Sequence, residues 1–347
     1  MQKRAVVCGF GSNNEISFPN IQEAHKRIQG ILHRTPVLKS SSISKMAGHE
    51  RELFFKCELF QKAGSFKPRG ALNAVILAEN DADEKGRKLQ NVITQSSGNM
   101  GQAVAWVCQN RGLTAHVVMP NDSAQCKMDA VAGYGANIIL CEPTIEARNK
   151  ATEKAQEELG AKYVHPHQDP HVVCGQGTVG LELVEQVREM TGGMDMDAVL
   201  VPVGGGGLCS GVAVAVKAMS PGTKVIGVEP EMASSAKPSR EAGNLISMNS
   251  LPNTLADGLR VSVGPITWPI MRDVVDDVVT VSEAQIQDTL KLVVSRMKLA
   301  IEPSAAVALA AALYSEDIKK KEGLHRIGVI LCGGNVDMSR LSNLLSS

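Results

Sequence analysis

Short apolar runs alternate with longer segments of mixed polarity along most of this chain. The apolar runs are rich in β-branched residues and bounded by glycine, proline or asparagine, which is typical of strands. The longer segments carry their apolar residues at helical spacing. The predicted strands are residues 91–94, 116–119, 137–140, 198–203, 224–228 and 326–331. The predicted helices are residues 102–109, 124–134, 145–159 and 208–219.

This alternation predicts an α/β fold made of βαβ units, with parallel sheets between layers of helices. The run at 198–203 is apolar throughout, as expected for a strand that is buried on both faces. Residues 91–140 form a βαβαβ module by themselves, and 347 residues exceed a single small core. We predict a small domain of residues 81–168 and a large domain built from residues 1–80 and 169–347.

Composition narrows the range of functions. The chain has 36 basic and 36 acidic residues, so bulk charge does not favour nucleic acid or an anionic membrane as partner. No apolar run approaches the roughly 18 residues of a membrane helix. The N-terminal residues lack the pattern of a secretory signal. The glycines of Gly9-Phe10-Gly11 are interpreted as a flexible entry into the fold and not as a ligand-binding loop. The 8 cysteines form no C-x-x-C pair, which indicates reduced, mostly buried thiols and a cytoplasmic protein.

Ligands of open α/β sheets bind at the carboxyl ends of the strands, which directs attention to three loops. The first is the run Gly204, Gly205, Gly206 and Gly207, between a predicted strand and a predicted helix. Glycine N–H groups at a helix start form an anion site suited to phosphate. The run matches neither the dinucleotide motif nor the P-loop motif. A tight strand–helix turn is the alternative interpretation.

The other two loops are ambiguous on their own. The segment SSGNMG at 96–101 could bind a carboxylate or simply cap the following helix. In CGGN at 332–335, Cys332 could be a core thiol, a hydrogen-bond partner or a nucleophile, and the absence of a nearby histidine pattern argues against the nucleophile. The histidine-rich run at 165–171 is interrupted by two prolines, so it is interpreted as a loop and not as a metal site.

Lys67 lies in the glycine-flanked stretch GSFKPRGA at 64–71. It could be a solvated loop charge, or an amine held in a dry pocket to attack a carbonyl. A lysine combined with a glycine phosphate cup is typical of pyridoxal phosphate sites, where Cys332 would then meet the pyridine nitrogen. Pro68 can occupy the first turn of a helix and biases Lys67 itself towards extended backbone.

Several stretches together resemble the fold-type II pyridoxal-phosphate enzymes, specifically the serine racemase and serine/threonine dehydratase group. The resemblance covers nearly the whole chain and implies two open, mostly parallel sheets in a large and a small domain. It is carried by TPVLKSSSIS, the stretch around GSFKPRGA, SSGNMGQA, YGANIILCEP, VPVGGGG, ADG, MKLAIEPSAA and CGGNVD. These stretches begin at residues 35, 54, 96, 134, 201, 256, 297 and 332.

The resemblance implies a role for each matching position. Lys67 would form the Schiff base and act as the base on one face of the substrate Cα, and Ser97 would act on the opposite face. The implied cofactor-binding residues are Phe66, Lys67, Asn99, Gly204, Gly205, Gly206, Gly207 and Cys332. The implied substrate-binding residues are Ser96, Ser97, Gly98, Asn99, Met100 and Asp257.

The chain departs from the family pattern at several positions. Cys332 stands where serine racemases usually have serine, and Met100 stands where histidine is frequent. Glu229 and Ala233 match a divalent-cation site, but Ser235 replaces the expected aspartate, so that site would be weaker, more hydrated or lost. A nucleotide site between subunits, implying ATP as activator and a homodimer, is matched more weakly at Lys62, Gln102, Tyr134 and Lys298.

The implied activity is racemisation of L- and D-serine, with β-elimination of serine to pyruvate and ammonia from the same carbanion. Two alternatives stay open. One is a serine/threonine or 3-hydroxyaspartate dehydratase with little racemisation. The other is a binding protein that kept the fold without catalysis.

Overall fold

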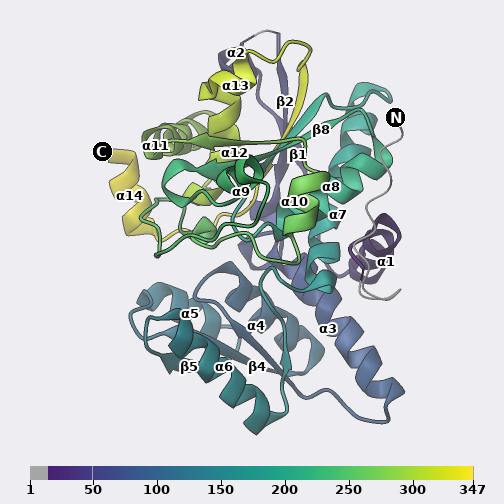
Figure 1. Cartoon of the computed structure of the whole chain (residues 1–347), viewed down its shortest axis with the longest axis vertical. Helices are drawn as coiled ribbons and strands as arrows, with labels where there is room; N and C mark the ends of the chain where they lie inside the picture. The colour runs from purple at the N-terminus through teal and green to yellow at the C-terminus, as the bar shows by residue number, and fades with distance from the viewer. Residues whose placement is uncertain (1–14, 49, 347) are drawn as a thin grey trace.

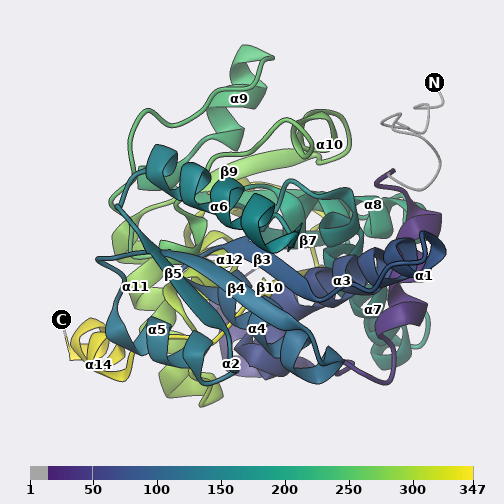
Figure 2. The same cartoon turned by 90° about the horizontal axis from the view of Figure 1, so that it is seen from below.

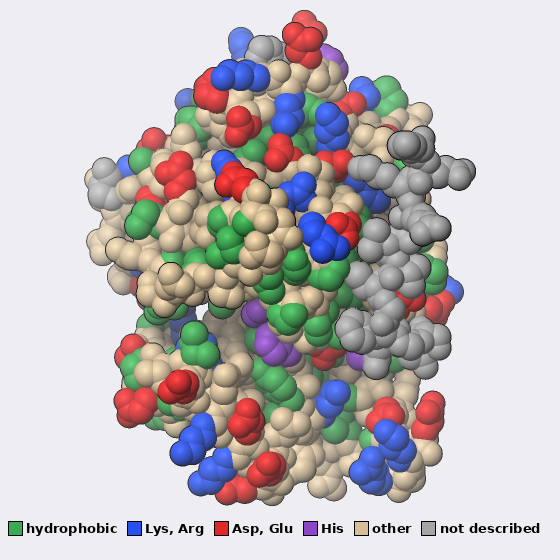
Figure 3. Space-filling view, in the orientation of Figure 1, with side chains coloured by type: hydrophobic (Ala, Val, Ile, Leu, Met, Phe, Trp, Pro, Cys, Tyr) green, Lys and Arg blue, Asp and Glu red, His purple; other side chains and the backbone are tan. Residues whose placement is uncertain are grey.

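The computed structural model describes residues 15–48 and 50–346 of the chain. Gly9-Phe10-Gly11 and Cys8 lie outside the described residues. Two sheets with their helices form an upper and a lower part of the molecule (Figure 1). A hollow opens at the waist between them, with histidine side chains beside it (Figure 3).

The larger sheet has six strands in the order β1-β2-β10-β7-β8-β9. All neighbours run parallel except β1, which pairs antiparallel with β2. Its central strand β7 is AVLVP, and every residue of it is buried, as the continuous apolar run predicts. The strands are β1 Val37–Lys39, β2 Glu52–Cys57, β7 Ala198–Pro202, β8 Lys224–Pro230, β9 Asp277–Val281 and β10 Arg326–Leu331.

Helices cover both faces of this sheet. In Figure 1, α11 and α12 lie on one side and α7 and α8 on the other. The helices of this part are α1 Phe18–Ile28, α2 Ser41–Met46, α7 Pro170–Thr191, α8 Gly207–Met219, α9 Ala236–Ala242, α10 Trp268–Asp273, α11 Glu283–Leu292, α12 Pro303–Tyr314, α13 Glu316–Lys319 and α14 Met338–Ser346.

The smaller sheet has four parallel strands in the order β5-β4-β3-β6. Alternate residues of its strands face different layers: Val92 packs in the cluster with α4, and Ile93 in the cluster with α6. Figure 2 shows α4 and α6 on opposite faces of this sheet. The strands are β3 Asn91–Gln95, β4 Thr114–Pro120, β5 Asn137–Cys141 and β6 Lys162–Tyr163. The helices are α3 Lys67–Glu84, α4 Asn99–Arg111, α5 Gln125–Ala132 and α6 Ile145–Leu159.

The predicted α/β class with two mostly parallel sheets is confirmed. The predicted βαβαβ module gains a fourth strand, β6, which is too short to stand out in the sequence. All strands of the smaller sheet lie within the predicted 81–168 range, whereas α3 crosses its lower boundary. The domain boundaries themselves stay a prediction.

Two further expectations concern the chain as a whole. The cysteines of the described residues are all free thiols, and most of them are buried, as predicted. Among residues 15–48 and 50–346, no helix is both long and apolar enough to cross a bilayer.

Candidate active site

The loops around Lys67 and Cys332 are joined by backbone hydrogen bonds, although they lie far apart in sequence. Phe66 N donates to Cys332 O at 3.1 Å, and Gly334 N donates to Gly64 O at 2.9 Å. Gly64 has a φ of +67°, and a Cβ there would overlap the side chain of Asn335. The turn between β2 and α3 is therefore fixed against the end of β10.

The Lys67 amine points into this junction. Its Nζ donates to Pro166 O at 3.0 Å and lies 5.1 Å from the centroid of the Phe66 ring. Burial lowers the pKa of Lys67 to about 8. This environment excludes the interpretation of Lys67 as a solvated loop charge.

The prediction of extended backbone at Lys67 is wrong. Helix α3 begins at Lys67, and Pro68 falls in its first turn. Proline is tolerated there because the first N–H groups of a helix have no intrahelical acceptor. Lys67 is consequently held by the rigid start of an 18-residue helix.

The glycine run forms the turn from β7 into α8. Gly206 has a φ of +83° and precedes the first residue of the helix, so its N–H group and those of the first turn face the strand end. A Cβ on Gly206 would lie 2.8 Å from Thr267 Oγ1, and one on Gly205 would overlap the His167 ring. Space as well as backbone conformation therefore requires glycine here.

Side chains from two distant loops support this cup. Thr267 Oγ1 donates to Gly205 O at 2.8 Å, and Gln168 Nε2 donates to Thr267 Oγ1 at 3.2 Å. The side-chain oxygen of Gln168, Oε1, in turn accepts from Ile266 N at 2.8 Å. The histidine-rich run is a loop, as predicted, up to Asp169, and its last two residues begin α7. The loop contacts both the cup and, through Pro166, Lys67.

Asn99 begins α4 and lies at the centre of a side-chain network. Its Nδ2 donates to the two carboxylate oxygens of Glu302 at 3.0 and 2.9 Å, and its Oδ1 accepts from Asn335 Nδ2 at 2.8 Å. Ser96 Oγ accepts from Gly98 N at 3.2 Å and shapes the preceding turn. The network connects the smaller sheet to the larger one at the waist.

Glu302 is a site residue that the sequence reasoning missed. It is 5% exposed, and its Oε1 lies 3.9 Å from Cys332 Sγ. Burial raises the pKa of Glu302 to about 7. Burial, reinforced by Glu302, raises the pKa of Cys332 well above its ordinary value, so Cys332 is a neutral thiol. The sequence feature that could have pointed to Glu302 is its position directly before Pro303, at the start of a helix.

The remaining predicted substrate residues have different surroundings. Ser97 is partly buried in the same loop as Asn99. Met100 is 1% exposed, and its side chain packs in the core of the smaller sheet. Asp257 pairs with Lys127 at 2.7 Å and with Arg340 at 3.2 Å, which joins α5 to the larger part of the molecule. Their contacts with substrate stay a prediction.

The four positions matched to a nucleotide site come from several elements. Lys62 lies in the short 3-10 turn Lys62–Gly64, which packs against α4, where Gln102 is buried. Tyr134 follows α5, and Lys298 has a φ of +60°. Their role in binding ATP stays a prediction.

The residues matched to a cation site do not fit a cation. Both oxygens of the Glu229 carboxylate accept hydrogen bonds from residues that follow Ala233. In the part of the chain that the structure describes, no group of three histidine, cysteine, aspartate or glutamate side chains could hold a metal ion.

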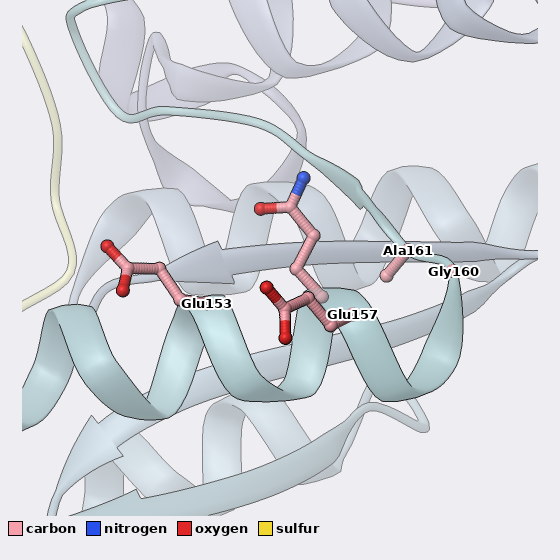
Figure 4. Close-up of a pocket in the computed structure, with 5 residues that line it drawn as sticks. Glu153, Glu157, Gly160 and Ala161 are labelled. Atoms are coloured by element: carbon pink, nitrogen blue, oxygen red, sulfur yellow. The ribbon is translucent and has the colours of Figure 1, made fainter.

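A surface hollow on α6 is separate from these groups (Figure 4). It is formed by α6 and the turn that follows it, and the side chains of Glu153 and Glu157 project from the helix beside it. None of the predicted site residues lines this hollow.

The groups around Lys67 fit pyridoxal phosphate. The cup at the start of α8 offers N–H donors to a phosphate, and its glycines leave the space that a Cβ would fill. An amine with a lowered pKa suits reaction with an aldehyde. The neutral Cys332 thiol suits an unprotonated ring nitrogen.

Comparisons with known proteins agree with this chemistry. Residues 28–333 match the family model described as "Pyridoxal-phosphate dependent enzyme". Serine racemase of Mus musculus is 45% identical over 94% of each chain. The structure of maize serine racemase is similar with a TM-score of 0.87 and 43% identity, covering 95% of this chain and 97% of that one. The structure of a T.th. threonine deaminase has a TM-score of 0.85 and 41% identity, covering 93% of this chain and 99% of that one. The chain belongs to the pyridoxal-phosphate dependent enzyme family.

Proposed function

We propose that this chain interconverts L- and D-serine and also eliminates the β-hydroxyl of serine to give pyruvate and ammonia. The observation that carries the proposal is the position of Lys67. Its amine, with a pKa of about 8, donates to Pro166 O, in the loop whose His167 packs against the glycine cup. The similarity to serine racemases over nearly the full chain supports serine as the substrate.

When bound, pyridoxal phosphate supplies an electron sink that makes the substrate Cα proton acidic. Lys67 then acts as base on one face of Cα, since a substantial share of an amine with this pKa is unprotonated near pH 8. The Ser97 hydroxyl delivers a proton to the opposite face. Racemisation needs both faces, whereas elimination needs only Lys67 and a departing hydroxyl.

The neutral Cys332 thiol tempers the electron sink, because it offers no charge to hold a proton on the ring nitrogen. A weaker sink favours proton transfer and elimination at Cα over other carbanion reactions. Asn99 and Glu302 hold the loop that would bind the substrate carboxylate.

The test is chiral analysis of serine together with detection of oxo acids, on the purified holoenzyme. L-serine should give D-serine and pyruvate. Ser97→Ala should depress racemisation far more than elimination, whereas Ser42→Ala, at an exposed serine of α2, should change neither. Equal retention of both activities in Ser97→Ala would remove Ser97 from the proposed role.

A dehydratase is the second candidate, supported by the similarity to the threonine deaminase. It would yield 2-oxobutyrate from L-threonine, or oxaloacetate from 3-hydroxyaspartate, faster than it racemises serine. A purified protein that carries no cofactor absorbance and turns over none of these substrates would support the non-catalytic alternative.

We further propose a cytoplasmic homodimer that ATP activates through Lys62, Gln102, Tyr134 and Lys298. Light scattering after size exclusion measures the assembly. Lys62→Ala should lose any ATP response while keeping the basal rate. The hydrogen bonds to the Glu229 carboxylate do not favour the divalent cation that was expected at Glu229 and Ala233.

A further inference from the structure

The segment between β8 and α9 is organised around one buried carboxylate. Glu229 is 0% exposed and lies near the end of β8. Its Oε1 accepts from Ser235 N at 2.9 Å and from Ala236 N at 2.8 Å. Its Oε2 accepts from Ser234 Oγ at 2.7 Å and from Lys237 N at 3.0 Å.

These donors fill the capacity of the carboxylate. An ionised carboxylate has about four lone-pair sites, and each of them has a donor here. Divalent cations such as Mg²⁺ and Ca²⁺ bind through the same lone pairs. A cation at Glu229 would therefore have to displace N–H groups, and it would lie against the positive end of α9.

The two serines complete the arrangement. Ser234 supplies its hydroxyl proton to Glu229, and Ser235 Oγ accepts from Val263 N at 3.0 Å. An aspartate at position 235 would offer a second carboxylate to a cation, but serine offers a neutral acceptor for one backbone N–H. Hydrogen bonds thus hold the loop at the place where a cation would otherwise bridge two carboxylates.

The same hydrogen bonds lead towards the cofactor cup. Val263 is followed by Gly264, whose N–H donates to Thr267 Oγ1 at 3.3 Å. Thr267 Oγ1 in turn donates to Gly205 O at 2.8 Å. The conformation of the loop after Glu229 is therefore connected to the glycine run by a short series of contacts.

We propose that Glu229 caps α9, and that Ser234 and Ser235 replace a divalent cation, so that this chain folds and retains pyridoxal phosphate without one. The proposal holds whichever amino acid is the substrate. It concerns stability and cation binding, so its failure is distinguishable from failure of the proposed racemase activity.

Thermal unfolding of the holoenzyme is the first test, in excess EDTA and in about 1 mM Mg²⁺ or Ca²⁺. The Tm should agree between the two conditions within about 1 °C. The cofactor absorbance should also be the same in both. A Tm that falls by several degrees in EDTA and recovers with Mg²⁺ would overturn the proposal.

Variants separate the cap from a metal site. Glu229→Gln should lower the Tm by several degrees equally in EDTA and in Mg²⁺, because the amide nitrogen cannot accept these bonds. Glu231→Gln, at an exposed position two residues away, is the matched control and should leave the Tm unchanged. An unchanged Tm for Glu229→Gln in EDTA would contradict the capping role.

Mn²⁺ titration followed by electron paramagnetic resonance measures binding directly. The wild-type protein and Glu229→Gln should leave the same amount of free Mn²⁺ at every point. One equivalent of bound Mn²⁺ that disappears in Glu229→Gln would show that Glu229 is a cation ligand and would overturn the proposal.

Discussion

Two lysines only 11 positions apart, Lys56 and Lys67, differ in the partners of their amines. Lys56 is fully buried in β2, and its Nζ donates to Glu182 at 2.6 Å and to Gln186 and Thr35 O, both at 2.8 Å. Lys67 donates to Pro166 O, at 3.0 Å. Burial lowers the pKa of both amines; the charges of Glu58 and Glu182 oppose this shift at Lys56, and Cys332 and Glu302 oppose it at Lys67.

Lys56 belongs to a buried ion cluster that we define as Lys56, Glu58, Arg69 and Glu182. Arg69 makes two hydrogen bonds to each glutamate, at 2.8 to 2.9 Å, so two cations face two anions. A buried charge is tolerated when it is paired in this way. The comparison teaches that pairing holds Lys56 as a structural cation, whereas Lys67 forms no ion pair within the part of the chain that the structure describes and so stays available for chemistry.

The largest expected effect comes from removing the unpaired lysine. Lys67→Ala should lower the turnover of L-serine by at least about 1,000-fold, because the residue serves as both anchor and base. It should also abolish the cofactor absorbance near roughly 410 nm while leaving the fold intact by circular dichroism. Retained absorbance and activity would show that Lys67 is neither the cofactor anchor nor the base.

Removing the paired lysine should act on stability. Lys56→Ala leaves the buried ion cluster with an uncompensated negative charge, which should lower the free energy of unfolding by about 3–5 kcal/mol. Urea unfolding measures this change. Lys26→Ala, which breaks an exposed pair with Glu23, is the control and should have no measurable effect. A stable Lys56→Ala protein would show that the pairing is dispensable.

The same contrast applies to the glutamates. Burial raises the pKa of Glu302 from 4.5 to about 7, whereas Arg69 and Lys56 hold the pKa of Glu182 below its ordinary value. Between pH about 4.5 and 7, the folded protein retains a proton on Glu302 that the unfolded chain releases. Glu302 should therefore reduce the free energy of unfolding as the pH rises through this window, by on the order of 3 kcal/mol.

Glu302→Gln is the matching variant, since it removes the titration but keeps a polar side chain. Its unfolding free energy, measured in urea at several pH values, should lose this decline between pH about 4.5 and 7. If the unfolding free energy of Glu302→Gln declined as much as that of the wild type, other groups would be responsible for the pH dependence.

The smallest expected effect concerns the capture of cofactor by Lys67. Only the unprotonated amine attacks an aldehyde, so the rate at which cofactor-free protein captures pyridoxal phosphate should rise about tenfold from pH 6 to 7 and level off above about 8. Stopped-flow absorbance measures the rate. A rise that continues unchanged to pH 10 would mean that Lys67 has the pKa of an exposed lysine.

Much of the fold and part of the site could be predicted from the sequence. The strands at 137–140 and 326–331 and the helix at 145–159 were predicted nearly to their observed ends, because their apolar periodicity is local. The start of α3 was not predicted correctly. A residue before proline prefers extended backbone, but at Lys67 the helix that follows overrides this preference. β6 was missed because a two-residue strand leaves no periodic signal.

The sequence by itself determined the α/β class, the glycine run and the presence of a lysine suited to an aldehyde cofactor, since these depend on local pattern and residue type. Only the tertiary structure decided which groups surround them. Glu302 became a site residue through Asn99, which lies 203 positions away in the chain. The donors to Glu229 lie only five to eight positions away, but the residue types do not show that they turn towards a buried carboxylate. The physical reason is that pKa and hydrogen-bond satisfaction depend on burial, and burial is set by segments that meet only in the folded chain.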